Sequence, residues 1–120
     1  MTALWQESAT SLAAAVRGKE ASALDVAEAH LDRALRWNDQ VEAFLHLDPE
    51  VVRKEAREID RRIAAGEDPG PLAGVPVAIK DNICVRGQPA TCASRTLPAS
   101  GPTWSRLDPN ATSPQRLTRP

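Results

Sequence analysis

PLAGVPVAIKDN, residues 71–82, is the stretch that decides the fold of this 120-residue sequence. Glycine and proline at residues 70–76 predict a rigid lead-in rich in turns, and the apolar residues 75–79 predict a short buried β-strand. Lys80 follows this strand directly. Because burial disfavours an ammonium ion, a partly desolvated lysine has a lowered pKa and can serve as a general base. The pattern on its own favours the alternative, a strand-end lysine whose ammonium reaches solvent.

The tetrapeptide at residues 77–80, Val-Ala-Ile-Lys, also surrounds the ATP-contacting lysine of protein kinases. A kinase needs a glycine-rich loop on the hairpin just upstream. Here a charged helical segment, residues 49–65, and a proline-containing turn occupy that place. The kinase interpretation is therefore excluded.

Residues 1–66 are predicted to be mostly helical. Ser22 and Asp25 have the spacing of a capping box, in which each side chain accepts an amide hydrogen at the helix start. An earlier, shorter helix is predicted to end at Gly18, and a later one begins with Asp48 as its cap and ends at Gly66. The residues predicted to face the core are Leu12, Ala15, Val16, Leu24, Ala27, Leu31, Leu35, Val52, Ala56, Ile59 and Ile63.

A short apolar run, residues 41–47, predicts a strand between the second and third helices. The two histidines, His30 and His46, have no Cys, Asp or Glu at metal-ligand spacing. We therefore expect ordinary structural positions for both, with no metal site and no cofactor. Two cysteines, Cys84 and Cys92, are too few for a disulfide framework.

The composition, with 42% hydrophobic and 26% charged residues, is that of one modest globular domain. No apolar run is long enough for a membrane span, and no secretory signal is recognisable, so we expect a cytoplasmic protein. Residues 1–70 carry a net charge of −5 and residues 71–120 one of +4. The basic residues of the second half are scattered, which gives no support for a nucleic-acid surface.

Residues 71–82, followed by Thr-Cys-Ala-Ser-Arg at 91–95, resemble the first conserved block of the amidase signature family. Lys-Asp-Asn-Ile-Cys at residues 80–84 is most similar to the family branch that provides the glutaminase component of tRNA-dependent amidotransferases. The resemblance covers about residues 8–97. It implies an α/β fold in which this N-terminal piece supplies helices and a core strand to a large mixed sheet with helices on both faces.

The resemblance also implies a function. In that family the lysine at the position of Lys80 belongs to a Ser–cis-Ser–Lys triad, and it draws a proton through the cis-serine so that a second serine can attack the amide carbon of glutamine. The ammonia then converts Glu-tRNA(Gln) to Gln-tRNA(Gln), with the B and C subunits, tRNA and ATP as the implied partners. Only Lys80 can be assigned here, because Ser94 lies in the matching block but matches neither catalytic serine.

The sequence departs from the family at its end. We expect residues 1–97 to be the N-terminal part of an amidase-signature domain and residues 98–120 to be a disordered tail foreign to it. The serines at 100, 105 and 113 lack the glycine surroundings of an oxyanion hole, so they are not candidates. These features predict a truncated or frame-shifted product that is inactive alone. The alternatives are a fragment of a general small-molecule amidase and a non-catalytic helical interaction module.

Overall fold

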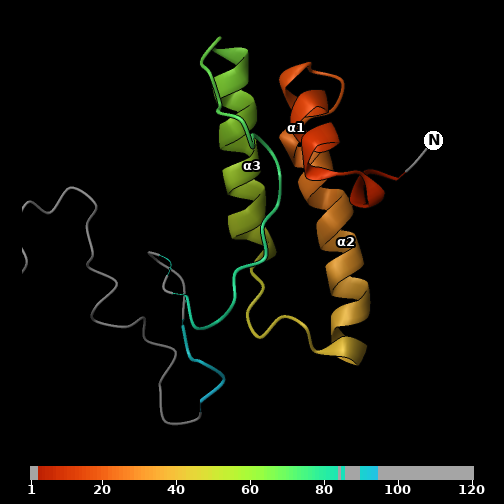
Figure 1. Cartoon of the computed structure of the whole chain (residues 1–120), viewed down its shortest axis with the longest axis vertical. Coiled ribbons are helices and arrows are strands. Elements are labelled where there is room, and N and C mark those ends of the chain that lie inside the picture. Colours follow the sequence, from red (N-terminus) through yellow and green to blue (C-terminus); the bar gives the residue numbers. More distant parts are fainter. Residues whose placement is uncertain (1–2, 84, 86–89, 95–120) are drawn as a thin grey trace, which may run out of the picture. The chain divides into compact units, whose positions relative to one another are not determined.

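A computed structural model describes residues 3–83, 85 and 90–94 of the chain. The chain divides into a first unit, Met1–Ala78, and a second unit, Ile79–Pro120, and each is described by itself. The first unit contains a short 3-10 helix, η1 (Leu4–Gln6), and three α-helices (Figure 1). These are α1 (Ala9–Arg17), α2 (Ala23–Val41) and α3 (Pro49–Ala64). The described part of the chain is thus helical, and the predicted tail, residues 98–120, lies outside it.

The predicted start of α2 is confirmed. The Asp25 amide donates to Ser22 Oγ at 2.9 Å, and the Ser22 amide donates to the Asp25 carboxylate at 3.1 Å, which is a complete capping box. This arrangement lowers the pKa of the Asp25 carboxyl, chiefly through the Ser22 hydroxyl and then through the Ser22 amide. The helix therefore begins where the sequence predicts, because the signal lies within four adjacent residues.

Asp60, on α3, completes the start of α2. Its two carboxylate oxygens accept the amides of Ala23 and Leu24 at 2.7 and 3.1 Å. A helix start leaves four amides without partners inside the helix. With Ser22 and Asp25 exchanging the other two bonds, all four amides at this end have a partner. A side chain of α3 thus holds the end of α2, and the sequence pattern did not reveal this contact.

The predicted ends of the other helices are also confirmed. Asp48 accepts two amides at the start of α3, where Pro49 has no amide hydrogen to satisfy. α3 ends at Ala64 with Ala65 as its C-cap, and the chain leaves the helix through Gly66, which has a φ of +78°. Gly18 is the C-cap of α1, but the left-handed residue of that turn is the following Lys19, with a φ of 60°. A lysine therefore accepts the strained conformation that glycine usually takes.

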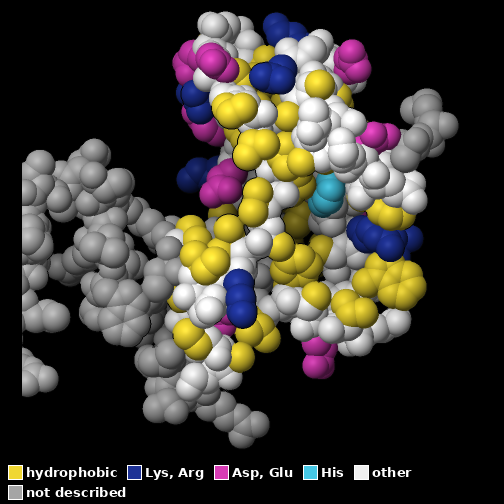
Figure 2. Space-filling view, viewed as in Figure 1, with side chains coloured by type: hydrophobic (Ala, Val, Ile, Leu, Met, Phe, Trp, Pro, Cys, Tyr) yellow, Lys and Arg dark blue, Asp and Glu magenta, His cyan; other side chains and the backbone are white. Residues whose placement is uncertain are grey.

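α2 and α3 run in opposite directions side by side (Figure 1). Small buried side chains allow the helices and the following loop to pack closely, and Figure 2 shows apolar side chains gathered down the middle of this face of the first unit. Between the two helices, Arg53 donates from Nε and Nη2 to both oxygens of Glu28, at 2.7 and 3.2 Å. The buried core comprises Leu12, Val16, Ala23, Val26, Ala27, Ala56 and Ala73.

The turn-rich lead-in, residues 70–76, is part of this core. Ala73 is 3% exposed, and Val75 packs against the buried cluster. Gly74, with a φ of +72°, lies so close to α1 and α2 that a Cβ built on it would be 2.9 Å from Val16 Cγ2. The turn at residues 71–74 is therefore fixed on the helices by direct packing.

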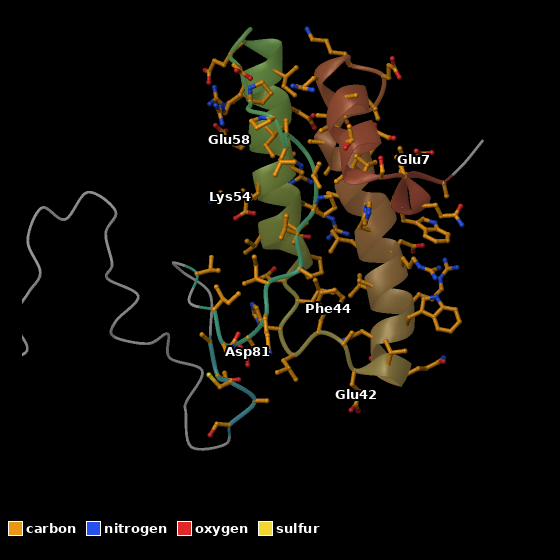
Figure 3. The ribbon with its side chains drawn as sticks, viewed as in Figure 1. Glu7, Glu42, Phe44, Lys54, Glu58 and Asp81 are labelled. Carbon is orange, nitrogen blue, oxygen red and sulfur yellow. The ribbon has the colours of Figure 1, made fainter. Side chains whose placement is uncertain are left out.

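The two predicted strands are wrong within the described residues, which contain no strand. Residues 75–79 are irregular, and Val77 and Ile79 are exposed, because no described segment offers an edge with which they could pair. Residues 42–47 form a loop after Glu42, which ends α2 in the left-handed conformation. The side chain of Asn38, on α2, accepts the Phe44 amide at 2.8 Å and donates to the Phe44 carbonyl at 3.0 Å. These two bonds use the main-chain groups of Phe44, labelled in Figure 3, that a strand would need for pairing.

Candidate functional site

Lys80, the predicted catalytic residue, lies at the beginning of the second unit. Its carbonyl oxygen accepts the Ile83 amide at 2.9 Å, which closes a tight turn directly after the lysine. The side chain is exposed. The exposure agrees with the solvent-reaching lysine that the pattern on its own favours, and the described residues do not provide the partial desolvation that a general base needs.

The next residue, Asp81, binds a second loop of the chain. One carboxylate oxygen accepts the amide of Thr91 at 3.0 Å, and the other accepts the Thr91 hydroxyl and the amide of Ala93, the latter at 3.1 Å. The carbonyl oxygen of Asp81 accepts the Cys92 amide at 3.2 Å. Asp81, which is labelled in Figure 3, thus ties residues 91–93 to the position that follows Lys80.

The loop that Asp81 binds has an unusual backbone. Cys92 and Ala93 have φ values of 51° and 55°, a left-handed conformation that residues with a Cβ adopt only where neighbouring contacts impose it. The Ser94 amide donates to the Thr91 carbonyl at 2.8 Å and closes the turn. The amides of Thr91 and Ala93 converge on the Asp81 carboxylate. We call this pair of converging N–H groups the nest, because two amides aimed at one carboxylate favour an anion there, as a backbone nest does.

The other candidate residues take ordinary places. His30 bonds its own helix, with Nδ1 2.8 Å from the Val26 carbonyl oxygen, and His46 is exposed. Ser94 is half-buried in the second unit and donates its amide to the Thr91 turn. Among the residues that the structure describes, no group of three His, Cys, Asp or Glu side chains is placed to hold a metal ion. No helix in the same part of the chain is long and apolar enough to cross a membrane.

Comparison with known proteins decides the family. The family model described as Amidase matches residues 25–104, well over half of the chain, and these residues include Lys80. This chain belongs to the amidase family. No solved structure matches it significantly.

Curated relatives of this amidase-family chain carry one name. The protein from Gloeobacter violaceus is 55% identical over 82 residues, which are 68% of this chain and 17% of the relative. The Salinispora tropica protein is 50% identical over 97 residues, 81% of this chain and 20% of the relative. The Salinispora arenicola protein is 52% identical over the same length, with the same shares. Each of the three is named as the A subunit of glutamyl-tRNA(Gln) amidotransferase, and this chain spans about a fifth of their length.

Asp81 is the residue of this amidase-family site to which the sequence analysis gave no role. It stands in the quoted motif, but its partners lie ten to twelve residues further along the chain. An aspartate followed at such a distance by a threonine is too common a spacing to indicate a hydrogen bond. The contact emerges only when the two turns, one after Lys80 and one at residues 91–94, are seen together.

Proposed function

We propose that this chain supplies the lysine-bearing N-terminal part of the A subunit of a glutamyl-tRNA(Gln) amidotransferase, the component that hydrolyses glutamine to release ammonia. One observation carries the proposal. Lys80 lies inside the family match, and the three relatives described above, which share about half of the aligned residues, bear the name of that component. The match to tRNA-dependent relatives favours this function over that of a general small-molecule amidase.

In the proposed reaction Lys80 is the base. Its neutral amine takes a proton from a serine, which in turn takes the proton of a second serine as the latter's oxygen bonds to the amide carbon of glutamine. The amide C–N bond then breaks while the proton held by Lys80 returns through the first serine to the leaving nitrogen, so that ammonia departs. Water then cleaves the acyl-enzyme to give glutamate and the free serine. The partner B and C subunits use the ammonia with ATP on Glu-tRNA(Gln), in the cytoplasm.

The exposure of Lys80 in this chain supports the proposal that the chain is inactive alone. No described residue packs over the side chain of Lys80, and a base without its serine nucleophile leaves the reaction uncatalysed. The residues that would desolvate Lys80, together with the two serines, belong in this proposal to the remaining four fifths of the enzyme component. We therefore expect no glutamine hydrolysis by the purified 120-residue chain.

The decisive experiment restores those parts. A chimera would carry this chain's matched 97 residues in place of the corresponding segment of the Salinispora tropica protein. We expect the chimera, assembled with its B and C subunits, to release ammonia from glutamine. Lys80→Ala should lower kcat by about 10²–10⁴-fold, the range in which general base catalysis contributes.

Lys54→Ala is the matched control, since Lys54 is an exposed lysine on α3 (Figure 3) and should leave kcat unchanged. An active chimera whose Lys80→Ala variant keeps full activity would refute the assignment of Lys80. Efficient hydrolysis of simple amides, with glutamine ignored, would instead identify a general amidase. A chimera that folds and assembles without any amidase activity would favour the non-catalytic module.

A further inference from the structure

Each of the three oxygens of Asp81, the residue that follows Lys80, accepts a hydrogen bond from residues 91–93. Both carboxylate oxygens accept donors from Thr91 and Ala93, and its carbonyl oxygen accepts the Cys92 amide. The carbonyl of Lys80 itself is occupied by the Ile83 amide. The peptide that joins Lys80 to Asp81 is therefore held from two directions, by the turn that follows it and by the loop at residues 91–93.

We infer that Asp81 is a positioning residue for Lys80. The carboxylate of Asp81 fills the nest at residues 91–93 and so fixes the backbone from which the lysine side chain projects. The inference rests on the proposed function, because the position of the Lys80 side chain matters for catalysis only if Lys80 is the general base. Its chemistry is separate, since Asp81 exchanges no proton in the reaction and touches no substrate.

The negative charge and the two oxygens of Asp81 are both required by this geometry. The nest offers backbone amides from Thr91 and Ala93 to different oxygens, so each oxygen must act as an acceptor. An asparagine would replace one acceptor by an NH₂ group, which can only donate. That NH₂ group would face an amide N–H or the Thr91 hydroxyl, and at least one hydrogen bond of the loop would be lost.

The left-handed residues strengthen the case that the carboxylate shapes the loop. Cys92 and Ala93 hold positive φ values without being glycine, and a conformation of this kind persists only when its surroundings impose it. The bonds from Asp81 to the amides of Cys92 and Ala93 act on these two residues directly. Without the anion, the loop is expected to relax and to release the turn after Lys80.

The first test uses the complete 120-residue chain and ¹⁵N relaxation of its backbone amides. We expect order parameters near 0.85 for Lys80, Thr91 and Ala93, falling below about 0.6 in Asp81→Ala. Excess formate, which replaces the missing carboxylate, should restore the order of the same amides in Asp81→Ala. Amides of Lys80 and Ala93 that are as ordered in Asp81→Ala as in the unchanged chain would overturn the inference.

Asp68→Asn is the matched control. The Asp68 carboxylate accepts the Gly70 amide at 2.9 Å, so this variant alters another carboxylate that holds a backbone turn. Asp68→Asn should leave the order parameters of Lys80 and Ala93 unaltered. Loss of order at those amides in both variants would show a general loosening of the chain and would contradict a specific role for Asp81.

The second test measures catalysis in the chimera described above. Asp81→Asn should lower kcat by about 10²-fold, the cost of misplacing a catalytic group by roughly 1 Å, with KM for glutamine unchanged because Asp81 does not contact substrate. An unchanged kcat in Asp81→Asn, while Lys80→Ala is inactive, would refute the positioning role and leave the proposed function intact. Full activity in Lys80→Ala would instead refute the proposed function itself.

Discussion

Replacing Gly74 by alanine is expected to destabilise the first unit far more than the same change at Gly66. Both glycines have positive φ, +72° and +78°, but only Gly74 lies against the core. A Cβ there would be 2.9 Å from Val16 Cγ2 and 3.1 Å from the Cβ of Ala23. Those two side chains are 1% and 0% exposed, so they cannot move aside without disturbing their own neighbours.

The two effects have different magnitudes. A left-handed conformation costs a residue with a Cβ about 1–2 kcal/mol, and this cost applies at both positions. Overpacking of a close-packed core adds about 1–3 kcal/mol, and it applies at Gly74 alone because nothing lies within 4 Å of a Cβ at Gly66. We therefore expect Gly74→Ala to lower the free energy of unfolding by about 1–3 kcal/mol more than Gly66→Ala does.

Urea denaturation followed by helical circular dichroism measures this difference. A double-mutant cycle with Val16→Ala isolates its cause, since that change removes the Cγ atoms that the new Cβ would meet. The Gly74→Ala change should cost less in the Val16→Ala background than in the unchanged chain. Equal losses at Gly74 and Gly66, or no coupling to Val16, would refute the packing that fixes the lead-in on the helices.

Other consequences concern the helical hairpin. Asp60→Ala should lower the free energy of unfolding by about 1–3 kcal/mol in urea denaturation, because two amides at the start of α2 lose a charged acceptor. The hydrogen bond from Arg53 lowers the pKa of the Glu28 carboxyl, so its stabilisation is fully present above about pH 4.3, the ordinary pKa of glutamic acid, and is lost as pH falls through the folded pKa. The difference in stability between the unchanged chain and Glu28→Gln should accordingly disappear in acid, and a difference that persists there would contradict an ionic origin. Arg33→Ala should cost about 0.5–1 kcal/mol and alter the Trp5 fluorescence, since the guanidinium carbon lies 3.9 Å from the centre of the Trp5 ring.

The sequence predicted the parts of the fold whose signals are local. The capping box of Ser22 and Asp25, and the start of α3 at Asp48, involve bonds that span two or three residues, so the pattern contains both partners. The Asp60 bond to the start of α2 joins positions 37 residues apart, and no periodicity records it. Residues 41–47 were predicted wrongly because their local apolar composition suits a strand. In the structure the Asn38 side chain bonds both the amide and the carbonyl of Phe44, so these groups cannot pair with another strand.

In the candidate site, too, the sequence predicted what depends on adjacent residues and missed what depends on distant contacts. The motif predicted which residue to examine, Lys80, because that prediction rests on a string of adjacent residues. The pattern alone favoured a lysine whose ammonium reaches solvent, which agrees with the exposed side chain, whereas the burial that a general base needs depends on segments that pack over it from elsewhere. The role of Asp81 also escaped the sequence, because the nest forms only when a distant turn adopts positive φ at Cys92 and Ala93.

The bond from Asp60 to α2 has a consequence for synthesis of the chain. A ribosome makes α2 well before residue 60, so two amides at the start of the new helix stay hydrated until α3 emerges. Bringing residue 60 back to residue 23 closes a loop, whose entropic cost is met only when the core residues of both helices are present. The first unit is therefore expected to close as one late cooperative event during translation. A nascent chain halted before residue 60 should carry a frayed α2.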